Sequence, residues 1–486
     1  MSPPRRAWAV GLLAGALCGC VVGPKYHKPP LSTPAAWGET AERPEQAPLS
    51  RTTSAEADLS HWWSVFNDPE LDRLVARALS GNLDLKVAAS RIRQARQQEI
   101  IAGAAGLPTL EAKPQTFHAH IPPNSVPKGV LAPVGVTEFI VNFDAAWEVD
   151  LFGGVRRSVE AARAQTMAAV WSRRDTEVSL TAEVASDYLA YRGLQRRETI
   201  IRDEADRQLR NLNIVASQGR GGLVPTLVVH QQTNQYKNTA AQLPTIQAQE
   251  RVQVHALGVL LGLEPEALSA ELAASAPLPG PPPVAPAGLP ADLLRRRPDL
   301  RAAERQLAAA NAQVGVAIAQ LYPKLNLSGA GGFISTDINR LLEWNSGLGV
   351  ASGGLTAPLY EGGRLQANVR SAREQKAQAL LQYENVLLGA LRDVEDALAR
   401  YAAEQRREVD LRASVEAAER AERAAEAQYQ GGQVTYIDVL TAEQSLLSAQ
   451  DQLVQSDIQL DQDLASLFKA LGGGWSADDP ADRVRR

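Results

Sequence analysis

The sequence contains two copies of one structural unit, and this duplication constrains its fold more than any other feature. Asp84-Leu85-Lys86 near the start of the first half resembles Asp299-Leu300-Arg301 in the second half. Further along, Leu151-Phe152-Gly153-Gly154 resembles Leu359-Tyr360-Glu361-Gly362. A third match pairs four residues with four others: Gly222, Val224, Leu227 and Val229 with Gly432, Val434, Ile437 and Val439. Three matches in the same order and at similar spacing indicate a tandem duplication.

The duplication divides the chain into segments. We expect a first structural repeat at 61–276 and a second at 291–471. Between them, 277–290 is rich in proline, so it is expected to form neither helix nor sheet but an extended connector. The remaining segments are a signal peptide at 1–19, a lipidated N-terminal arm at 20–60 and a C-terminal tail at 472–486.

Each repeat contains an unusually long run without proline. Val155 to about Ser217 and Arg364 to about Gln430 lack proline entirely. As helices, these runs of roughly 60 residues would each span about 95 Å, at 1.5 Å per residue. After the second run, leucines recur at every seventh position: Leu446, Leu453, Leu460 and Leu467. A sustained seven-residue repeat of leucine predicts supercoiled pairing between long helices.

A shorter part of each repeat has the alternation of β-strands. From Phe139 to Leu151, apolar residues alternate with mainly polar ones, which predicts a strand with one apolar and one wet face. The wet face would carry Asp144, Glu148 and Asp150, which we expect to face water. In total the sequence predicts four strands, at about 107–122 and 136–151 in the first repeat and about 322–335 and 345–360 in the second.

The paired long helices are joined by tight turns. Gly221-Gly222 and Gly431-Gly432 are expected to end one helix of each pair, because glycine readily adopts the left-handed conformation of a C-cap. Thr435 and Asp438 have the spacing of a capping box at the start of the next helix. Pro225, at the position equivalent to Thr435, suits a first helical turn.

The N-terminus has the features of a bacterial secretory signal. Arg5 and Arg6 precede the short apolar run Ala7–Leu17, which is too short to span a bilayer as a helix. Leu17 and Gly19 give Cys20 the surroundings of a lipobox cysteine, which predicts N-palmitoyl and S-diacylglycerol groups on Cys20. The alternative is ordinary signal cleavage with an unmodified cysteine. No later segment is an uncharged apolar run long enough for a transmembrane helix.

Four strands are too few to cross a membrane alone. The smallest membrane barrels have about eight strands, and open sheet edges are excluded from lipid because their backbone groups are unpaired. A membrane-spanning barrel must therefore be shared between chains. Two chains would give eight strands around a filled interior, whereas three would give about twelve strands, enough to leave a lumen. The strand count itself requires only an oligomer of at least two.

These residues resemble the TolC-type outer-membrane efflux channels, specifically the lipoprotein branch that is NodT-like and OprM-like. The resemblance runs from Cys20 to about Leu471. Its motifs are Cys20-Val21-Val22-Gly23-Pro24-Lys25-Tyr26, Trp62-Trp63 with Asp68-Pro69, Leu294-Arg295-Arg296-Arg297-Pro298-Asp299-Leu300, Leu359-Tyr360-Glu361-Gly362-Gly363-Arg364 and the turn Gly432–Leu440.

The resemblance implies a mainly α fold with a small β part: a homotrimer with a 12-stranded β-barrel and a 12-helix periplasmic tunnel. It implies a passive efflux duct for small molecules in the outer membrane of a Gram-negative bacterium. Its hairpin tips would contact a periplasmic adaptor (membrane fusion) protein coupled to an inner-membrane pump. The tip residues are Gly221, Gly222, Pro225, Gly431, Gly432, Thr435 and Asp438. One departure is that the counterpart of Asp438 in the first copy is Val228, which leaves the first tip's contribution open.

The sequence offers no catalytic constellation, no cofactor motif and no metal site. His118 and His120 could share a strand face, but no third ligand accompanies them, so a solvated pair is the preferred interpretation. The 50 basic and 55 acidic side chains nearly balance, which argues against nucleic-acid binding. We therefore expect no enzymatic activity and no nucleic-acid partner.

Two further hypotheses follow from the predicted architecture. The second helical hairpin is expected to swing outward and open the periplasmic end, because a long seam of small residues can hold two packings of similar energy. The acidic strand residues Asp144, Glu148 and Asp150 are expected to bias passage toward cations. The competing interpretation is a lipid-anchored periplasmic coiled-coil scaffold without channel activity, which a conductance measurement would separate from a channel.

Overall fold

The computed structural model describes residues 21–38, 51–53, 58–120, 122, 135–282, 284–286, 288 and 290–476. The predicted signal peptide at 1–19 and Cys20 lie outside the described residues. The chain forms two compact units. The first combines Met1–Pro30, Arg91–Ala169 and Ala303–Tyr383, and the second combines Leu31–Ser90, Val170–Ala302 and Glu384–Arg486.

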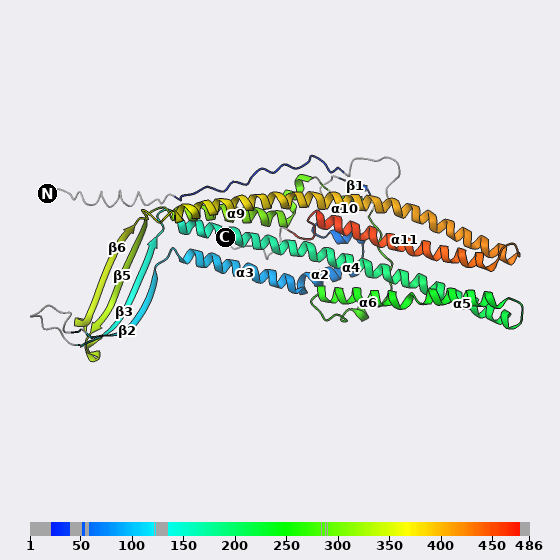
Figure 1. Ribbon diagram of the computed structural model, residues 1–486, viewed down its shortest axis with the longest axis horizontal. Helices are drawn as coiled ribbons and strands as arrows, with labels where there is room; N and C mark the ends of the chain where they lie inside the picture. The colour runs from blue at the N-terminus through cyan, green and yellow to red at the C-terminus, as the bar shows by residue number, and fades with distance from the viewer. Residues whose placement is uncertain are drawn as a thin grey trace, which may run out of the picture. The chain divides into compact units, whose positions relative to one another are not determined.

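Helices make up most of the described chain (Figure 1). Two of them, α4 (Gly154–Arg220) and α10 (Arg364–Gln430), have 67 residues each, in the two runs that lack proline. The other helices of eight or more residues are α2 (Pro69–Gly81), α3 (Leu83–Ala104), α5 (Thr226–Ala240), α6 (Leu243–Leu260), α9 (Pro298–Ala319) and α11 (Tyr436–Ala470). The short ones are α7 (Ser269–Leu272) and α8 (Leu293–Arg296), with 3-10 turns at Trp62–Phe66, Pro290–Asp292, Ile338–Arg340 and Trp344–Ser346.

The first unit contains an antiparallel four-stranded sheet in the order β2-β3-β5-β6 (Figure 1). Its strands are β2 (Thr109–His120), β3 (Gly135–Val149), β5 (Lys324–Ser335) and β6 (Gly347–Thr356). Each repeat contributes one hairpin, and the β3–β5 pairing joins the two hairpins. The edge strands of the sheet are therefore β2 and β6.

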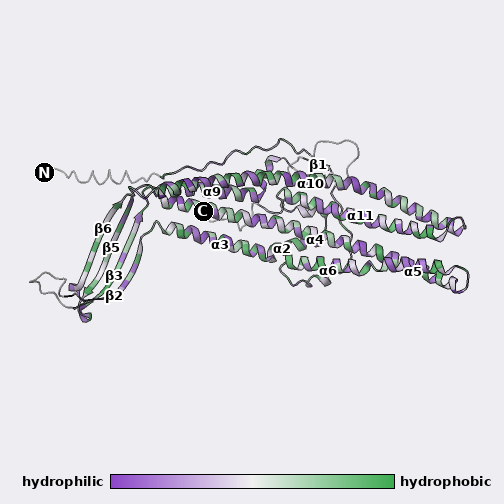
Figure 2. Ribbon diagram, in the orientation of Figure 1, coloured by the Kyte–Doolittle hydropathy of each residue, from purple (hydrophilic) through white to green (hydrophobic). Residues whose placement is uncertain are grey.

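The register gives this sheet a polar face and an apolar face. Because side chains alternate along each strand, the pairings Glu111↔Asp144 and Glu148↔Asn326 place these side chains on one face. The opposite face carries mostly apolar residues, including Leu110, Phe139, Val141, Phe143, Trp147, Leu325, Leu327, Phe333 and Leu355. Hydrophobic and hydrophilic residues alternate along the strands in Figure 2.

In the second unit, long helices pack through a leucine-rich seam. On α10 the residues at 4-3-4-3 spacing include Leu387, Val394, Leu398 and Tyr401, and these four are buried. On α11, Leu446, Leu460 and Leu467 of the predicted heptad are buried as well, while Leu453 is only half-buried beside the buried Val454. The predicted seam is therefore confirmed at three of its four heptad leucines.

The return helices of the two copies differ. In the second copy α11 continues for 35 residues, whereas in the first copy the chain is interrupted at Ala241–Gln242 and forms α5 and α6. Pro244 lies in the first turn of α6, where its missing N–H costs no helical hydrogen bond. Proline thus explains why a new helix begins there.

The proline-rich connector departs from expectation. Val284–Pro286 forms a short strand, β4, that pairs in parallel with β1 (Arg51–Thr53). The prediction that 277–290 forms no sheet is therefore wrong. Proline is compatible with a strand at a sheet edge, because only one side of an edge strand needs its N–H groups for pairing.

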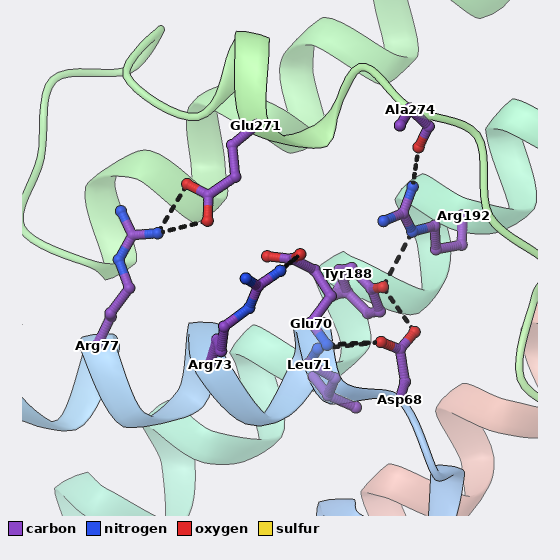
Figure 3. A network of polar contacts seen from close by, with 9 residues as sticks. All are labelled: Asp68, Glu70, Leu71, Arg73, Arg77, Tyr188, Arg192, Glu271 and Ala274. Carbon is purple, nitrogen blue, oxygen red and sulfur yellow. Dashed lines mark hydrogen bonds and ion pairs between the residues drawn. The ribbon is translucent and has the colours of Figure 1, made fainter.

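The Asp68-Pro69 motif has a structural role at the start of α2 (Figure 3). One carboxylate oxygen of Asp68 accepts from the backbone N–H groups of Glu70 (2.8 Å) and Leu71 (3.3 Å). The other accepts from the hydroxyl of Tyr188 on α4 (2.6 Å), to which Arg192 also donates (3.0 Å). The motif thus caps α2 and fastens it to α4.

Candidate channel wall and hairpin tips

The polar face of the sheet carries two groups of paired charges. Lys113 Nζ lies 3.1 Å from a Glu111 oxygen and 3.0 Å from an Asp144 oxygen. Lys324 Nζ lies 3.0 Å from Glu148 Oε1. The structure therefore places Asp144 and Glu148 on the polar face and brings each next to a lysine. Neither lysine was predicted as a partner, because the proximity of each lysine to its carboxylate depends on strand register, which the local alternation of each strand does not specify.

Asp150 has a different position from the other two acidic candidates. It follows the last residue of β3, and its oxygens accept from the backbone N–H groups of Val155 (3.1 Å) and Arg156 (3.0 Å). A carboxylate is favourable there, because the first turn of a helix has unpaired N–H groups and a positive dipole end. Asp150 thus serves the start of α4, and the expectation that it faces water from the strand is not met.

The apolar face of the sheet is uncovered in the single chain. Leu110, Phe143 and Leu355 are exposed by 72%, 53% and 66%. Isolated exposed apolar side chains are common on proteins, but a whole apolar sheet face indicates a surface that lipid or another chain covers. Trp147, near the end of β3, lies on the same face and donates through Nε1 to the carbonyl of Gly106 (2.9 Å).

Both hairpin turns in the second unit are closed by glycine in the left-handed conformation. The φ angles of Gly222 and Gly432 are +70° and +69°. In each turn the residue after this glycine donates back to a carbonyl five residues earlier, Leu223 to Gln218 and Gln433 to Gln428, both at 2.9 Å. This is the Schellman pattern. The predicted glycine caps are confirmed.

The start of α11 has the predicted capping box. The Asp438 carboxylate accepts from the Thr435 N–H (2.8 Å) and from the Thr435 hydroxyl (2.6 Å). These hydrogen bonds lower the pKa of Asp438 below its usual value. In the first copy, Pro225 is the N-cap of α5 and makes no side-chain bond.

The two tips present different chemistry to the solvent. At the first tip Leu223 and Leu227 are exposed by 78% and 64%. At the second tip Ile437 is exposed by 48%, next to the charged Asp438. Gly221 and Gly431 precede the left-handed glycines, and their φ angles are not positive. The first tip therefore exposes two leucines beside the basic Arg220, and the second combines an apolar side chain with an acidic one.

Polar bonds link the helices of the first hairpin to those of the second. Each bond joins α4 or α5 to α10 or α11, and none of them was predicted from the sequence. They include Arg207 to Glu422 (2.5 Å), Arg197 to Asp451 (2.7 Å), Arg196 to Asp457 (2.7 Å), Gln235 to Gln444 (2.6 Å), Tyr436 to Gln232 (2.6 Å) and Gln462 to the carbonyl of Ser186 (3.3 Å). They are the contacts that an outward movement of the second hairpin would break.

In the first unit, the segment that follows Cys20 is fixed to the helices. Val22 donates its N–H to the Phe152 carbonyl (3.1 Å). The buried Arg157 of α4 donates to the carbonyls of Val22 (3.0 Å) and Gly23 (3.1 Å). Such charge-assisted bonds to a non-helical segment hold its backbone in place. The second and third residues after the predicted lipidation site are thus attached close to the end of β3.

Two kinds of feature are absent from the described residues. Among them, no group of three or more His, Cys, Asp or Glu side chains has a metal-binding arrangement. In the same part of the chain, no helix combines the length and the apolar character needed to cross a membrane.

Known proteins match nearly the whole chain. The family model described as outer membrane efflux protein matches residues 74–263 and 289–473. Nodulation protein T of Rhizobium leguminosarum bv. viciae is 32% identical over 477 residues, covering 96% of this chain and 94% of the relative. The pyoverdine export outer membrane protein OpmQ of Pseudomonas aeruginosa is 33% identical over 457 residues, covering 92% and 94%.

A solved structure has the same fold. The outer-membrane channel OprN superimposes with a TM-score of 0.84 at 32% identity, covering 94% of this chain and all of that one. The family resemblance drawn from the motifs is confirmed, and so is the mainly α fold with a small sheet. The chain belongs to the outer membrane efflux protein family, and it is a channel subunit of the bacterial outer membrane.

Proposed function

We propose that three copies of this chain close their four-stranded sheets into one twelve-stranded wall around a water-filled passage. The observation that carries the proposal is the sheet of the single chain, which has two edge strands, β2 and β6, and one polar and one apolar face. Pairing β2 of one copy with β6 of the next satisfies the edge backbone groups, which lipid cannot do. Three chains give a wall wide enough for a lumen.

The two faces assign the inside and the outside of this wall. The apolar face with Leu110, Phe143 and Leu355 turns to lipid, and the polar face lines the passage. On the polar face four carboxylates outnumber the two lysines: Glu111, Glu138, Asp144 and Glu148 against Lys113 and Lys324. This excess of negative charge favours cations in the passage.

The long helices continue the passage on the periplasmic side. Leu381 and Leu388 on α10 are 63% and 65% exposed and lie seven residues apart, a spacing that suits pairing with a helix of another copy. The duct opens when α10 and α11 move away from α4 and α5, which breaks the bond between Arg207 and Glu422 and its equivalents along the seam.

The hairpin tips receive a periplasmic adaptor protein that is coupled to an inner-membrane pump. The contact involves the glycine turns at Gly221-Gly222 and Gly431-Gly432 together with Pro225, Thr435 and Asp438. A diacylglycerol and a palmitoyl group on Cys20 anchor the chain, and Arg157 fixes the segment behind the anchor. The duct carries small molecules passively and needs no cofactor.

Crosslinking between sheet edges tests the proposal. A chain with cysteines in place of Gln115 on β2 and Val350 on β6 is treated in membranes with a bifunctional maleimide. Each chain then joins two neighbours, so the ladder of covalent products ends at three chains. Variants with only one of these cysteines are the matched controls and give no ladder. Uncrosslinked monomers from the double variant would refute a shared wall.

A further inference from the structure

Helix α11 of the second unit carries a carboxyl group with no partner. Asp461 is 1% exposed, and neither of its oxygens has a hydrogen-bond partner. Buried polar groups in folded proteins are almost always hydrogen-bonded, and a buried charge is almost always paired. An ionised Asp461 would violate both regularities.

The neighbouring charges are already balanced without Asp461. On α10, Glu408 is 2% exposed and accepts from Arg412 Nε (2.6 Å). On α11, Asp457 accepts from Arg196 of α4 (2.7 Å), and Arg412 also approaches it to 4.0 Å. The two guanidinium groups thus match Glu408 and Asp457, and no positive charge is left for a third carboxylate. The site as built favours a proton on Asp461.

We propose that Asp461, together with Asp457 and Glu408, forms a proton-binding site that keeps α11 packed against α10 and α4. When the site loses its proton, three carboxylates share two arginines, and the packing of α11 weakens. The ligand is a proton, since no metal-binding arrangement of acidic side chains occurs in the described residues.

The geometry shifts the pKa values of all three carboxyl groups in the same direction. Burial, and then the negative charges of Asp457 and Glu408, raise the pKa of Asp461 well above its usual value. Burial also raises the pKa of Glu408 and of Asp457. A carboxyl with a raised pKa in the folded state stabilises that state at low pH, and the contribution is lost as the pH rises through the raised pKa.

The consequence for transport rests on the proposed function, whereas the proton site itself does not. If α10 and α11 move to open the duct, a proton on Asp461 favours the closed packing. Alkaline conditions then favour opening. Asp457 and Asp461 are four residues apart on α11, which places both carboxyls on the same side of the helix, where Arg412 of α10 approaches Asp457 to 4.0 Å.

Infrared spectroscopy of the full-length protein in detergent tests the proton directly. At neutral pH the wild type is expected to show the C=O stretching band of protonated carboxylic acids, to which other buried carboxyls such as Glu443 also contribute, and Asp461→Asn is expected to weaken that band. Asp410→Asn, at an exposed position on α10, is the matched control and keeps the band. An unchanged band in Asp461→Asn would overturn the proposal.

Hydrogen exchange measures the effect of the proton on the packing of α11. It can also be applied to a variant that is produced in lower amounts than the wild type. Amides of α11 in the wild type are expected to lose protection as the pH rises, by up to tenfold per pH unit beyond the intrinsic base catalysis for one proton released. Asp461→Asn and Glu408→Gln are expected to reduce this pH dependence. The same dependence in both variants as in the wild type would refute the link between the proton and the packing.

Discussion

Replacing Arg207 with glutamine tests the proposed opening movement. Arg207 on α4 donates to Glu204 of its own helix and to Glu422 Oε1 on α10 (2.5 Å). The substitution removes the bond between the hairpins and leaves Glu204, Glu422 and the buried Glu443 facing one another without a cation. The variant is therefore expected to favour the open duct.

The size of the effect follows from the surroundings of the pair. The Arg207 side chain is 36% exposed and that of Glu422 is 12% exposed, so solvent screens the attraction in part. A pair of this kind contributes roughly 1 kcal/mol. That energy corresponds to about a fivefold change in the closed-to-open ratio per subunit. Three identical pairs in a trimer would sum to roughly 3 kcal/mol, if the subunits open together.

Open probability in planar lipid bilayers is the assay. Arg207→Gln and Glu422→Gln are each expected to increase it, and the double variant is expected to add little to either single change. Arg210→Gln, at an exposed position one turn further along α4, is the control. The same open probability in Arg207→Gln, Arg210→Gln and the wild type would refute the role of this bond in closure.

Three further predictions concern the tip, the passage and the seam. Gly432→Val forces a β-branched residue to φ +69°. A Cβ added at this position would have no neighbouring atom within 4 Å, so the cost of the substitution is backbone strain alone. We expect about 1–2 kcal/mol of local destabilisation and loss of export with normal membrane insertion, and a milder defect for Gly432→Asn. Glu148→Gln leaves Lys324 unpaired and should shift reversal potentials toward anions, whereas Lys324→Gln should shift them toward cations. Burial and the charge of Glu204 raise the pKa of Glu443 to about 7, so its stabilising contribution is complete below about 4.5 and is lost as the pH rises through about 7. The melting temperature of the wild type should fall across this window by more than that of Glu443→Gln, corresponding to at most about 3 kcal/mol.

Local patterns were sufficient to predict several elements. The absence of proline located α4 and α10, and the alternation from Phe139 onward located β3. Thr435 and Asp438 predicted the N-terminal cap of α11, because a capping box lies within four consecutive residues. Each of these features depends on residues that are close in sequence.

Features that depend on distant residues were not predictable in the same way. Lys113 and Lys324 reach their acidic partners only through the strand register, and Arg207 meets Glu422 only when two long helices lie together. Asp150 continues the alternation of the strand in the sequence, but its carboxylate accepts a hydrogen bond from the backbone N–H of Val155 at the start of α4. Local alternation therefore identified the strand but not the point at which it gives way to a helix.

Conductance combined with mass measures most directly whether several copies of the chain build one passage. Full-length acylated protein is purified in detergent, its mass is determined by light scattering, and the same sample is inserted into planar bilayers. A wall shared by three chains predicts a particle of three chains and discrete, cation-preferring current steps. A monodisperse single chain that inserts into the bilayer without carrying current would contradict it.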